Sequence, residues 1–170
     1  SEVTFADCRV PNDSLLGEEG SGAFVFTDAM EWERAFIMAC AIGSMERQLE
    51  LCIRYKNTRK QGGRRIGEFQ SVSNKIAEMK MRLEGGRLLL YKAAWLKNSG
   101  RSAFMESAMT KVVLSQAFVR NSQDALQIHG TYGYMTESEL ERDLRDAIAG
   151  NFYSGTTEVL TDLVAKLVTP

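Results

Sequence analysis

The sequence predicts an all-α protein: an up-and-down four-helix bundle with short extra helices at its C-terminal end and a short extended arm at its N-terminus. Three observations lead to this prediction. Apolar residues recur at steps of three and four along most of the 170 residues, as in helices that bury one face. Only two prolines occur, Pro11 and Pro170, so none breaks a helix in the interior. The interruptions between periodic stretches are short and rich in glycine.

Residues 1–21 differ from the rest of the chain. Their apolar residues alternate as in a β-strand, and a turn is expected at Pro11-Asn12-Asp13. A lone strand cannot bury itself. We therefore interpret residues 1–21 as an extended remnant of a preceding β-domain and its linker, with a disordered arm as the alternative. The helical domain is expected over residues 22–170. The alternating residues are Val3, Phe5, Cys8 and Val10.

A first long helix is predicted from Ala23 to Tyr55. Glu33 falls on its apolar stripe, whereas Glu31 has polar helical neighbours and is expected to be solvated. A buried carboxylate is costly unless it is paired or functional, so Glu33 is a candidate catalytic residue. The alternative is a residue at the edge of the stripe that reaches solvent or pairs with Arg34. The predicted stripe is Phe26, Met30, Ile37, Ala41, Met45, Leu49 and Cys52.

The loop 56–68 joins this helix to the next. Five cationic residues surround Gly62-Gly63 just before a predicted helix N-terminus, an arrangement that suits an anion, although loop charges are commonly only solvated. A second helix is predicted over 68–98 and a third over 102–129. The second has the stepping of an antiparallel bundle. The buried set predicted for the third includes Met105, Met109, Val112, Val119 and Leu126.

The C-terminal segment is predicted to form two shorter helices. Thr136 and Ser138 each precede a glutamate by three residues, which is capping-box spacing for a helix to about Ala149. A last helix is expected after Gly155, capped by Thr156 or Thr157.

Composition excludes several classes of function. The net charge of −1 argues against nucleic acid as the main partner. No apolar run has the length of a membrane span. Three widely spaced cysteines and one histidine, His129, indicate neither a disulfide framework nor a metal site, and we expect a cytoplasmic protein. His129 is interpreted as a packing residue.

Four segments, in order along the chain, resemble the C-terminal half of the acyl-CoA dehydrogenases. The segment VTFADCRVPNDSLLGEEGSG resembles the end of that family's middle β-domain. The other three, TRKQGGRRIGEFQ, QIHGTYGY and LERDLRDAIAGNFYSGTTEV, resemble the family's ERKQFGKPIxxFQ, QxxGGxGY and ERxxRDAxxxxIYEGTxEI. The resemblance implies a helical C-terminal domain, a flavin enzyme that uses FAD, and a homo-oligomer, either a dimer or a tetramer. It also implies further domains before these residues.

The resemblance also implies site residues. Arg59 matches the arginine that reaches the FAD diphosphate, and Gln70 matches the glutamine at its adenosine end. Gln127, Gly130 and Thr131 fall on a segment that approaches the FAD of a neighbouring subunit. Thr156 and Glu158 match positions that touch the pyrophosphate and adenosine portions. Cations beside glycines and a threonine-capped helix N-terminus are chemically suited to a diphosphate.

The sequence departs from the family at three positions. Gly62 replaces a phenylalanine that packs by the adenine, and Thr131 replaces a glycine. Ser154 stands where many members carry the catalytic glutamate, and a serine cannot act as that base without an activating partner. A second branch of the family carries its base in LxxERL on the first helix of this domain, and the matching segment here, Met30–Arg34, places Glu33 on that base.

The predicted function is α,β-dehydrogenation of an acyl thioester, with Glu33 as the base. The acyl group would be carried by CoA or, as an alternative, by a carrier protein of secondary metabolism, and an electron-transfer acceptor would reoxidise the flavin. Two further alternatives remain, a non-catalytic member that keeps the fold for assembly and an oxidase or monooxygenase variant.

Overall fold

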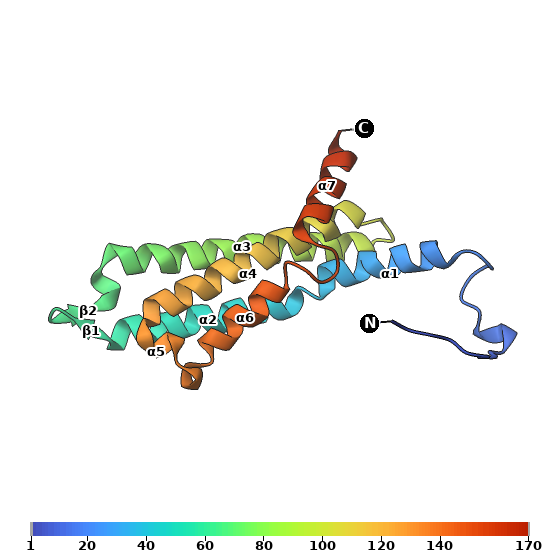
Figure 1. The fold of residues 1–170 in the computed structure, drawn as a ribbon. Coiled ribbons are helices and arrows are strands. Elements are labelled where there is room, and N and C mark those ends of the chain that lie inside the picture. Colours follow the sequence, from blue (N-terminus) through green and yellow to red (C-terminus); the bar gives the residue numbers. More distant parts are fainter. Residues whose placement is uncertain (1, 170) are drawn as a thin grey trace.

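The computed structural model describes residues 2–169 and confirms the all-α prediction (Figure 1). Ser1 and Pro170, at the outer ends of the two predicted domains, lie outside the described residues. A two-residue hairpin pairs Lys60 with Arg65 and Gln61 with Arg64. The elements are α1 (Gly22–Phe36), α2 (Ala39–Thr58), β1 (Lys60–Gln61), β2 (Arg64–Arg65), α3 (Gln70–Asn98), α4 (Phe104–His129), α5 (Thr131–Tyr134), α6 (Leu140–Ala149) and α7 (Thr157–Val168), with 3-10 turns at Asn12–Ser14, Ile66–Glu68 and Thr136–Ser138.

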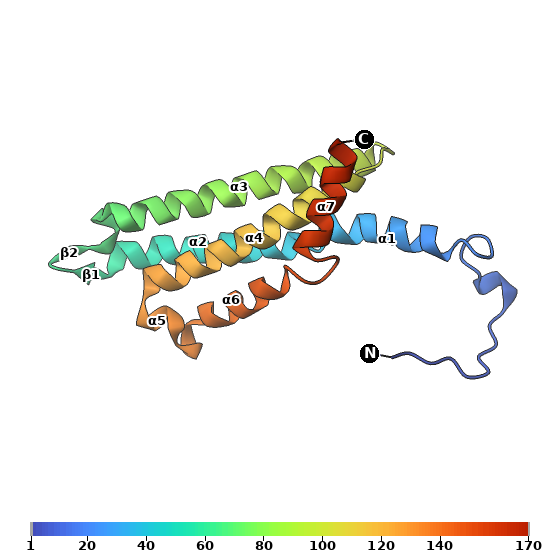
Figure 2. The ribbon, with the colours of Figure 1, turned by 45° about the horizontal axis from the view of Figure 1, so that its top comes forward.

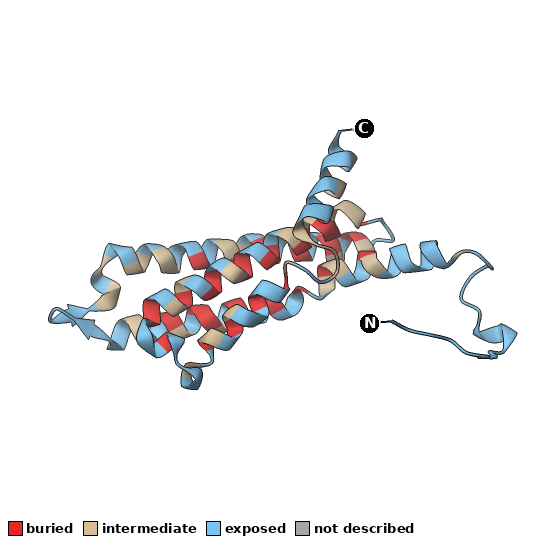
Figure 3. Ribbon diagram, viewed as in Figure 1, coloured by how far each residue is buried: buried red, intermediate tan, exposed pale blue. Residues whose placement is uncertain are grey.

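Helix α4 lies at the centre of the bundle and contacts α1, α2, α3, α6 and α7. Helices α1 and α2 follow one another in the same direction, α3 returns alongside α2, α4 reverses again, and α7 projects from one end (Figures 1 and 2). Helices α3 and α4 approach closely at Gly86, where an added Cβ would lie 2.2 Å from a methyl carbon of Leu114. The buried residues follow the inward faces of the helices (Figure 3).

The predicted first helix is two helices. The regular pattern is interrupted at Ile37 and Met38, between α1 and α2. The buried stripe runs through Met38, which the predicted stripe omitted, while Ile37 and Phe26 are exposed. The prediction followed the large apolar residues of α1, whereas the contact face of α1 passes through the small side chain of Ala35. The buried stripe observed across both helices is Glu31, Ala35, Met38, Ile42, Met45, Leu49 and Cys52.

The buried set predicted for the third helix is also wrong. All five predicted residues are only half-buried. Besides Leu114 and Phe118, many of the buried positions of α4 are small or polar, and the prediction passed over them because it followed large apolar residues. These small or polar positions include Ser107, Ala108, Thr110, Lys111, Ser115 and Asn121.

The terminal segments agree in part with prediction. Thr156 caps α7, since its hydroxyl oxygen accepts from the backbone N–H of Val159 at 3.4 Å. The predicted caps of the preceding helix are wrong, because α6 follows Glu139 in a left-handed conformation and has no side-chain cap. Within the described residues, 2–21 form no β-ladder, and their larger apolar side chains are exposed. Their assignment to a preceding β-domain therefore remains a prediction.

Candidate functional site

The predicted site residues gather at two opposite ends of the bundle (Figure 1). The first group, which we name the hairpin end, contains Arg59, Gln70, Gln127, Gly130 and Thr131. The second group, the turn end, contains Glu33, Thr156 and Glu158 around the turn Tyr153–Thr156. Each group contains residues that are far apart in sequence. The fold therefore brings the predicted site residues together in two places instead of one.

At the turn end, Glu33 and Ser154 are in direct contact. The Ser154 hydroxyl donates a hydrogen bond of 2.6 Å to Oε1 of Glu33, across 121 residues of sequence. The two positions at which the resembling family carries its base therefore meet at one point in this chain.

The Tyr153–Thr156 turn is held by two cations. Nε of Arg34 donates to the Ser154 carbonyl at 3.3 Å, and Nζ of Lys111 donates to the Gly155 carbonyl at 2.6 Å. Ser154 has φ 56° and Gly155 has φ 101°, so both adopt a backbone conformation that residues other than glycine rarely take. The turn is thus fixed by long-range contacts rather than by local preference.

Sequence reasoning missed Lys111. Its side chain is fully buried, and its pKa is lowered by desolvation, an effect that the nearby Glu158 carboxylate opposes. Among residues 2–169, its ammonium forms no ion pair, and the Gly155 carbonyl is its hydrogen-bond acceptor. Fully buried lysines are rare. The signal was present in the sequence, because Lys111 lies one helical turn from both Ala108 and Leu114 on the buried face of α4.

The environments of Glu31 and Glu33 in α1 are the reverse of those predicted. Glu31 is buried: its Oε1 accepts from the Ala103 backbone N–H at 2.6 Å and lies 3.3 Å from Nζ of Lys97. Glu33 is exposed in this chain. The prediction that Glu33 lies on the buried stripe is therefore wrong, because the stripe passes through Ala35 and Met38. Its candidacy as a base now depends on its match to the family motif and on its contact with Ser154.

At the hairpin end, the predicted residues are exposed and stand at helix termini. Arg59 follows the last residue of α2, Gln70 begins α3, and Gln127 lies in the last turn of α4. Gly130 has φ 59° and ψ −139°, a conformation essentially restricted to glycine, and it turns the chain from α4 into Thr131 and α5. These residues present a guanidinium, two amides and backbone groups to solvent.

A stack of rings lies beside Arg59. The centroids of Tyr55 and His129 are 4.3 Å apart, and the ring of Tyr132 is nearly parallel to that of Tyr55 at 6.1 Å. His129 is buried, and its Nδ1 lies 2.9 Å from the Ala125 carbonyl oxygen. Burial lowers the pKa of His129, which that hydrogen bond partly opposes. This environment agrees with a packing role.

One copy of the chain does not bring the two ends together. Lys111, at the turn end, and His129, at the hairpin end, are 18 residues apart on α4, which corresponds to about 27 Å along the helix axis. Arg59 and Thr156 of one chain are therefore too far apart to contact the same diphosphate group.

The donors at each end suit the phosphate and nucleotide parts of FAD. Arg59 forms no ion pair within residues 2–169, and its guanidinium matches phosphate geometry. The α7 N-terminus carries the capping Thr156 and free backbone N–H groups, which favour anions. The residues present therefore fit that cofactor, with a separate contribution from each end.

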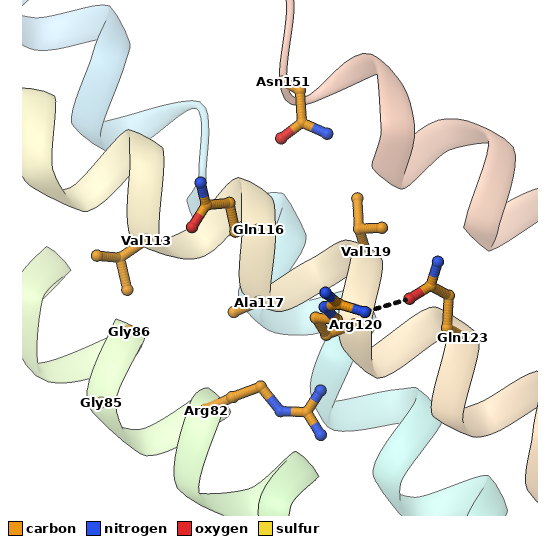
Figure 4. A pocket seen from close by; sticks show the side chains of 10 residues that line it. All are labelled: Arg82, Gly85, Gly86, Val113, Gln116, Ala117, Val119, Arg120, Gln123 and Asn151. Carbon is orange, nitrogen blue, oxygen red and sulfur yellow. Dashed lines mark hydrogen bonds between the residues drawn. The ribbon is translucent and has the colours of Figure 1, made fainter. Parts of the chain in front are cut away.

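A groove of about 740 Å³ lies away from both ends, on the faces of α3 and α4 (Figure 4). It contains none of the predicted site residues. Its arginines are committed, Arg82 to Asp124 and Arg120 to the side-chain oxygen of Gln123. We assign no catalytic role to this groove. Its lining residues are Arg82, Gly85, Gly86, Val113, Gln116, Ala117, Val119, Arg120, Gln123 and Asn151.

Residues 2–169 contain no cluster of three or more His, Cys, Asp or Glu side chains suited to a metal ion. None of the helices in this part of the chain has the length and apolar character needed to cross a membrane. All three cysteines are free thiols.

Comparison with known proteins gives consistent matches. The L-prolyl-[peptidyl-carrier protein] dehydrogenase of Pseudomonas fluorescens is 43% identical over 165 residues, covering 97% of this chain and 43% of that protein. The crystal structure of the prolyl acyl carrier protein oxidase AnaB superposes with a TM-score of 0.94 and 49% identity, covering 97% of this chain and 44% of AnaB.

The butyryl-CoA dehydrogenase of Megasphaera elsdenii also superposes with a TM-score of 0.94, at 36% identity, covering 98% of this chain and 43% of that enzyme. The chain thus spans less than half the length of the relatives it matches. Residues 20–169 match the profile of the family described as acyl-CoA dehydrogenase, C-terminal domain. The chain therefore belongs to the acyl-CoA dehydrogenase family, as its C-terminal helical domain.

Proposed function

We propose that this chain is the C-terminal part of an FAD-dependent dehydrogenase that desaturates an acyl thioester, with Glu33 as the catalytic base. The observation that carries the proposal is the 2.6 Å contact between Glu33 and Ser154. Ser154 occupies one of the two family positions for the base but has no carboxylate. Because the two positions touch here, the Glu33 carboxylate on α1 reaches the same place.

The chemistry requires a base at the α-carbon of the thioester. The α-proton is weakly acidic, so the base must be well placed and shielded from water. Glu33 is exposed in this chain, and we propose that the remainder of the enzyme, the cofactor and the substrate cover it. Bound FAD would accept the hydride from the neighbouring carbon. Glu33 would hold the α-proton, and Arg34 and Lys111 would keep the adjacent turn in place.

The separation of the two ends supports a cofactor site shared between two copies. Thr156 and Glu158 would contact the FAD of their own subunit. The hairpin end of a second copy, with Arg59, Gln70, Gln127, Gly130 and Thr131, would close on the phosphates and adenosine of the same FAD. This division requires a homo-oligomer, a dimer or a tetramer, and it explains why these residues are exposed in a single chain.

We propose that the substrate is a prolyl group on a carrier protein, in preference to an acyl-CoA. Two relatives named for that substrate class have 43% and 38% identity to this chain, and AnaB has 49%. The acyl-CoA dehydrogenase of Bacillus subtilis has 39% and the short-chain enzyme of Homo sapiens 35%. The electron acceptor is proposed to be a protein, with dioxygen as the alternative because AnaB is named an oxidase.

The test uses a full-length enzyme that contains this chain, purified with its flavin and held without oxygen. L-prolyl carrier protein, butyryl-CoA and the carrier protein without an acyl group are added in separate titrations. We expect the prolyl thioester to bleach the oxidised flavin, butyryl-CoA to do so poorly, and the unloaded carrier to do nothing. An enzyme bleached only by butyryl-CoA would reverse the substrate order. A full-length protein without flavin would support the non-catalytic alternative.

A further inference from the structure

The proposed proton transfer does not use Ser154, Lys111 or Arg34 directly, yet Ser154 and Lys111 have unusual structural features. Ser154 adopts φ 56°, a strained conformation for a residue other than glycine. Lys111 is fully buried and bonded to a backbone carbonyl. Both features involve the turn from which the Ser154 hydroxyl donates a hydrogen bond to Oε1 of Glu33.

The geometry separates the two oxygens of Glu33. Oε1 accepts the 2.6 Å hydrogen bond from Ser154, and within residues 2–169 no such partner is found for Oε2. A carboxylate held by one oxygen has a fixed direction for the other, which a base needs in order to meet a carbon-bound proton.

The position of the hydroxyl depends on the clamp behind it. Arg34 holds the Ser154 carbonyl from α1, and Lys111 holds the Gly155 carbonyl from α4. Without these donors the turn has no local reason to keep φ positive at Ser154. Nζ of Lys111 also lies 6.0 Å from the ring centroid of Tyr153, the first residue of the same turn.

We infer that Ser154 is a positioning residue for the Glu33 base, and that Lys111 and Arg34 hold the turn that presents its hydroxyl. The inference rests on the proposed function, since it assigns Ser154 a role in the same proton transfer. Arg34 is also a charged neighbour of Glu33, and its Nε donates to the Ser154 carbonyl.

The test compares variants of the full-length, flavin-loaded enzyme by anaerobic stopped-flow. The rate of flavin reduction is followed at increasing concentrations of L-prolyl carrier protein, which separates the saturated rate from the apparent dissociation constant of the substrate. Ser154→Gly removes the hydroxyl and relieves the strain at φ 56°, so it preserves the fold. Ser154→Ala removes the hydroxyl with the strain retained. Ser99→Ala is the matched control, because the exposed Ser99 hydroxyl donates to the Trp95 carbonyl of its own helix and not to Glu33.

We expect both Ser154 variants to lower the saturated rate of flavin reduction about tenfold and to leave the apparent dissociation constant of the substrate unchanged, because the Glu33 carboxylate loses the hydrogen bond that sets its direction. Ser99→Ala should match the wild type in both quantities. Lys111→Met should lower the saturated rate in the same way, and the surface variant Lys80→Met should not.

The outcomes distinguish this inference from the proposed function. Glu33→Gln abolishes flavin reduction if the proposed function is right, whatever Ser154 does. If Glu33→Gln is inactive while both Ser154 variants keep the wild-type saturated rate, the positioning role is wrong and the base assignment stands. A wild-type saturated rate in a folded, flavin-containing Lys111→Met would remove Lys111 from the clamp. If Glu33→Gln is active, both proposals fail.

Discussion

The two ends of the bundle differ in how their functional side chains are held. At the turn end, Glu33, Ser154, Arg34 and Lys111 are linked by hydrogen bonds that cross more than 40 residues of sequence. At the hairpin end, Arg59, Gln70 and Gln127 are exposed on helix termini. The turn end is thus organised within one chain, and we propose that the hairpin end acquires its partner when two copies assemble.

The largest effect is expected at the turn end, from Glu33→Gln. The amide cannot take the α-proton, and general-base catalysis typically contributes 10²–10⁴-fold, so the rate of flavin reduction should fall about a thousandfold. Stopped-flow absorbance measures this rate. Flavin content should stay unchanged, which separates loss of chemistry from loss of cofactor. Wild-type reduction by the variant would show that the base lies elsewhere.

Glu31→Ala should damage stability instead of chemistry. Removing this buried carboxylate leaves the Ala103 N–H without its acceptor and leaves Lys97 with only the more distant carboxylate of Asp28, at 3.9 Å. We expect the free energy of unfolding of this chain to fall by about 3 kcal/mol. Urea denaturation followed by circular dichroism measures it. Glu33→Ala is the matched control and should change stability by less than about 0.5 kcal/mol. Equal losses in the two variants would contradict the burial difference.

Arg59→Glu probes the hairpin end. Reversing this charge removes a charge-assisted contact to phosphate, so FAD affinity of the full-length enzyme should weaken about 30-fold. Fluorescence titration of the apoenzyme with FAD gives the affinity. Lys60→Glu makes the same charge change on the next residue and should have a much smaller effect. Equal weakening would mean that only the general charge of the hairpin matters.

The smallest effect is the contribution of His129 to the loss of stability at acidic pH. Its folded-state pKa is lowered from 6.5 by burial, so the unfolded chain binds a proton that the folded chain resists. Stability is therefore present above about pH 6.5 and is lost as pH falls toward the folded pKa, by at most about 1.4 kcal/mol per pH unit. Unfolding measured in steps from pH 7 to 5 shows this slope, and His129→Gln should flatten it. An unchanged slope in His129→Gln would assign the acid sensitivity to other groups.

The sequence was sufficient for the fold class, most helix boundaries and the Thr156 cap, because periodicity and capping are local properties. It was insufficient for the environment of Glu31 and Glu33. Helical periodicity gives the spacing of a buried face, but the choice of face depends on which side of α1 meets the turn between α3 and α4. Lys111 and the Ser154 contact escaped prediction because they depend on long-range packing, although the position of Lys111 on the buried face could have been noticed.

The central claim is that one active site combines the turn end of one copy with the hairpin end of another. Glu33→Gln and Arg59→Glu subunits, each inactive alone when no FAD is added, are co-expressed with different tags and purified through both. In a mixed dimer, one site has an intact Glu33 and an intact Arg59 from the two different subunits, and the other has neither. We predict about half of the wild-type activity. Activity no greater than that of the two parents would contradict a shared site.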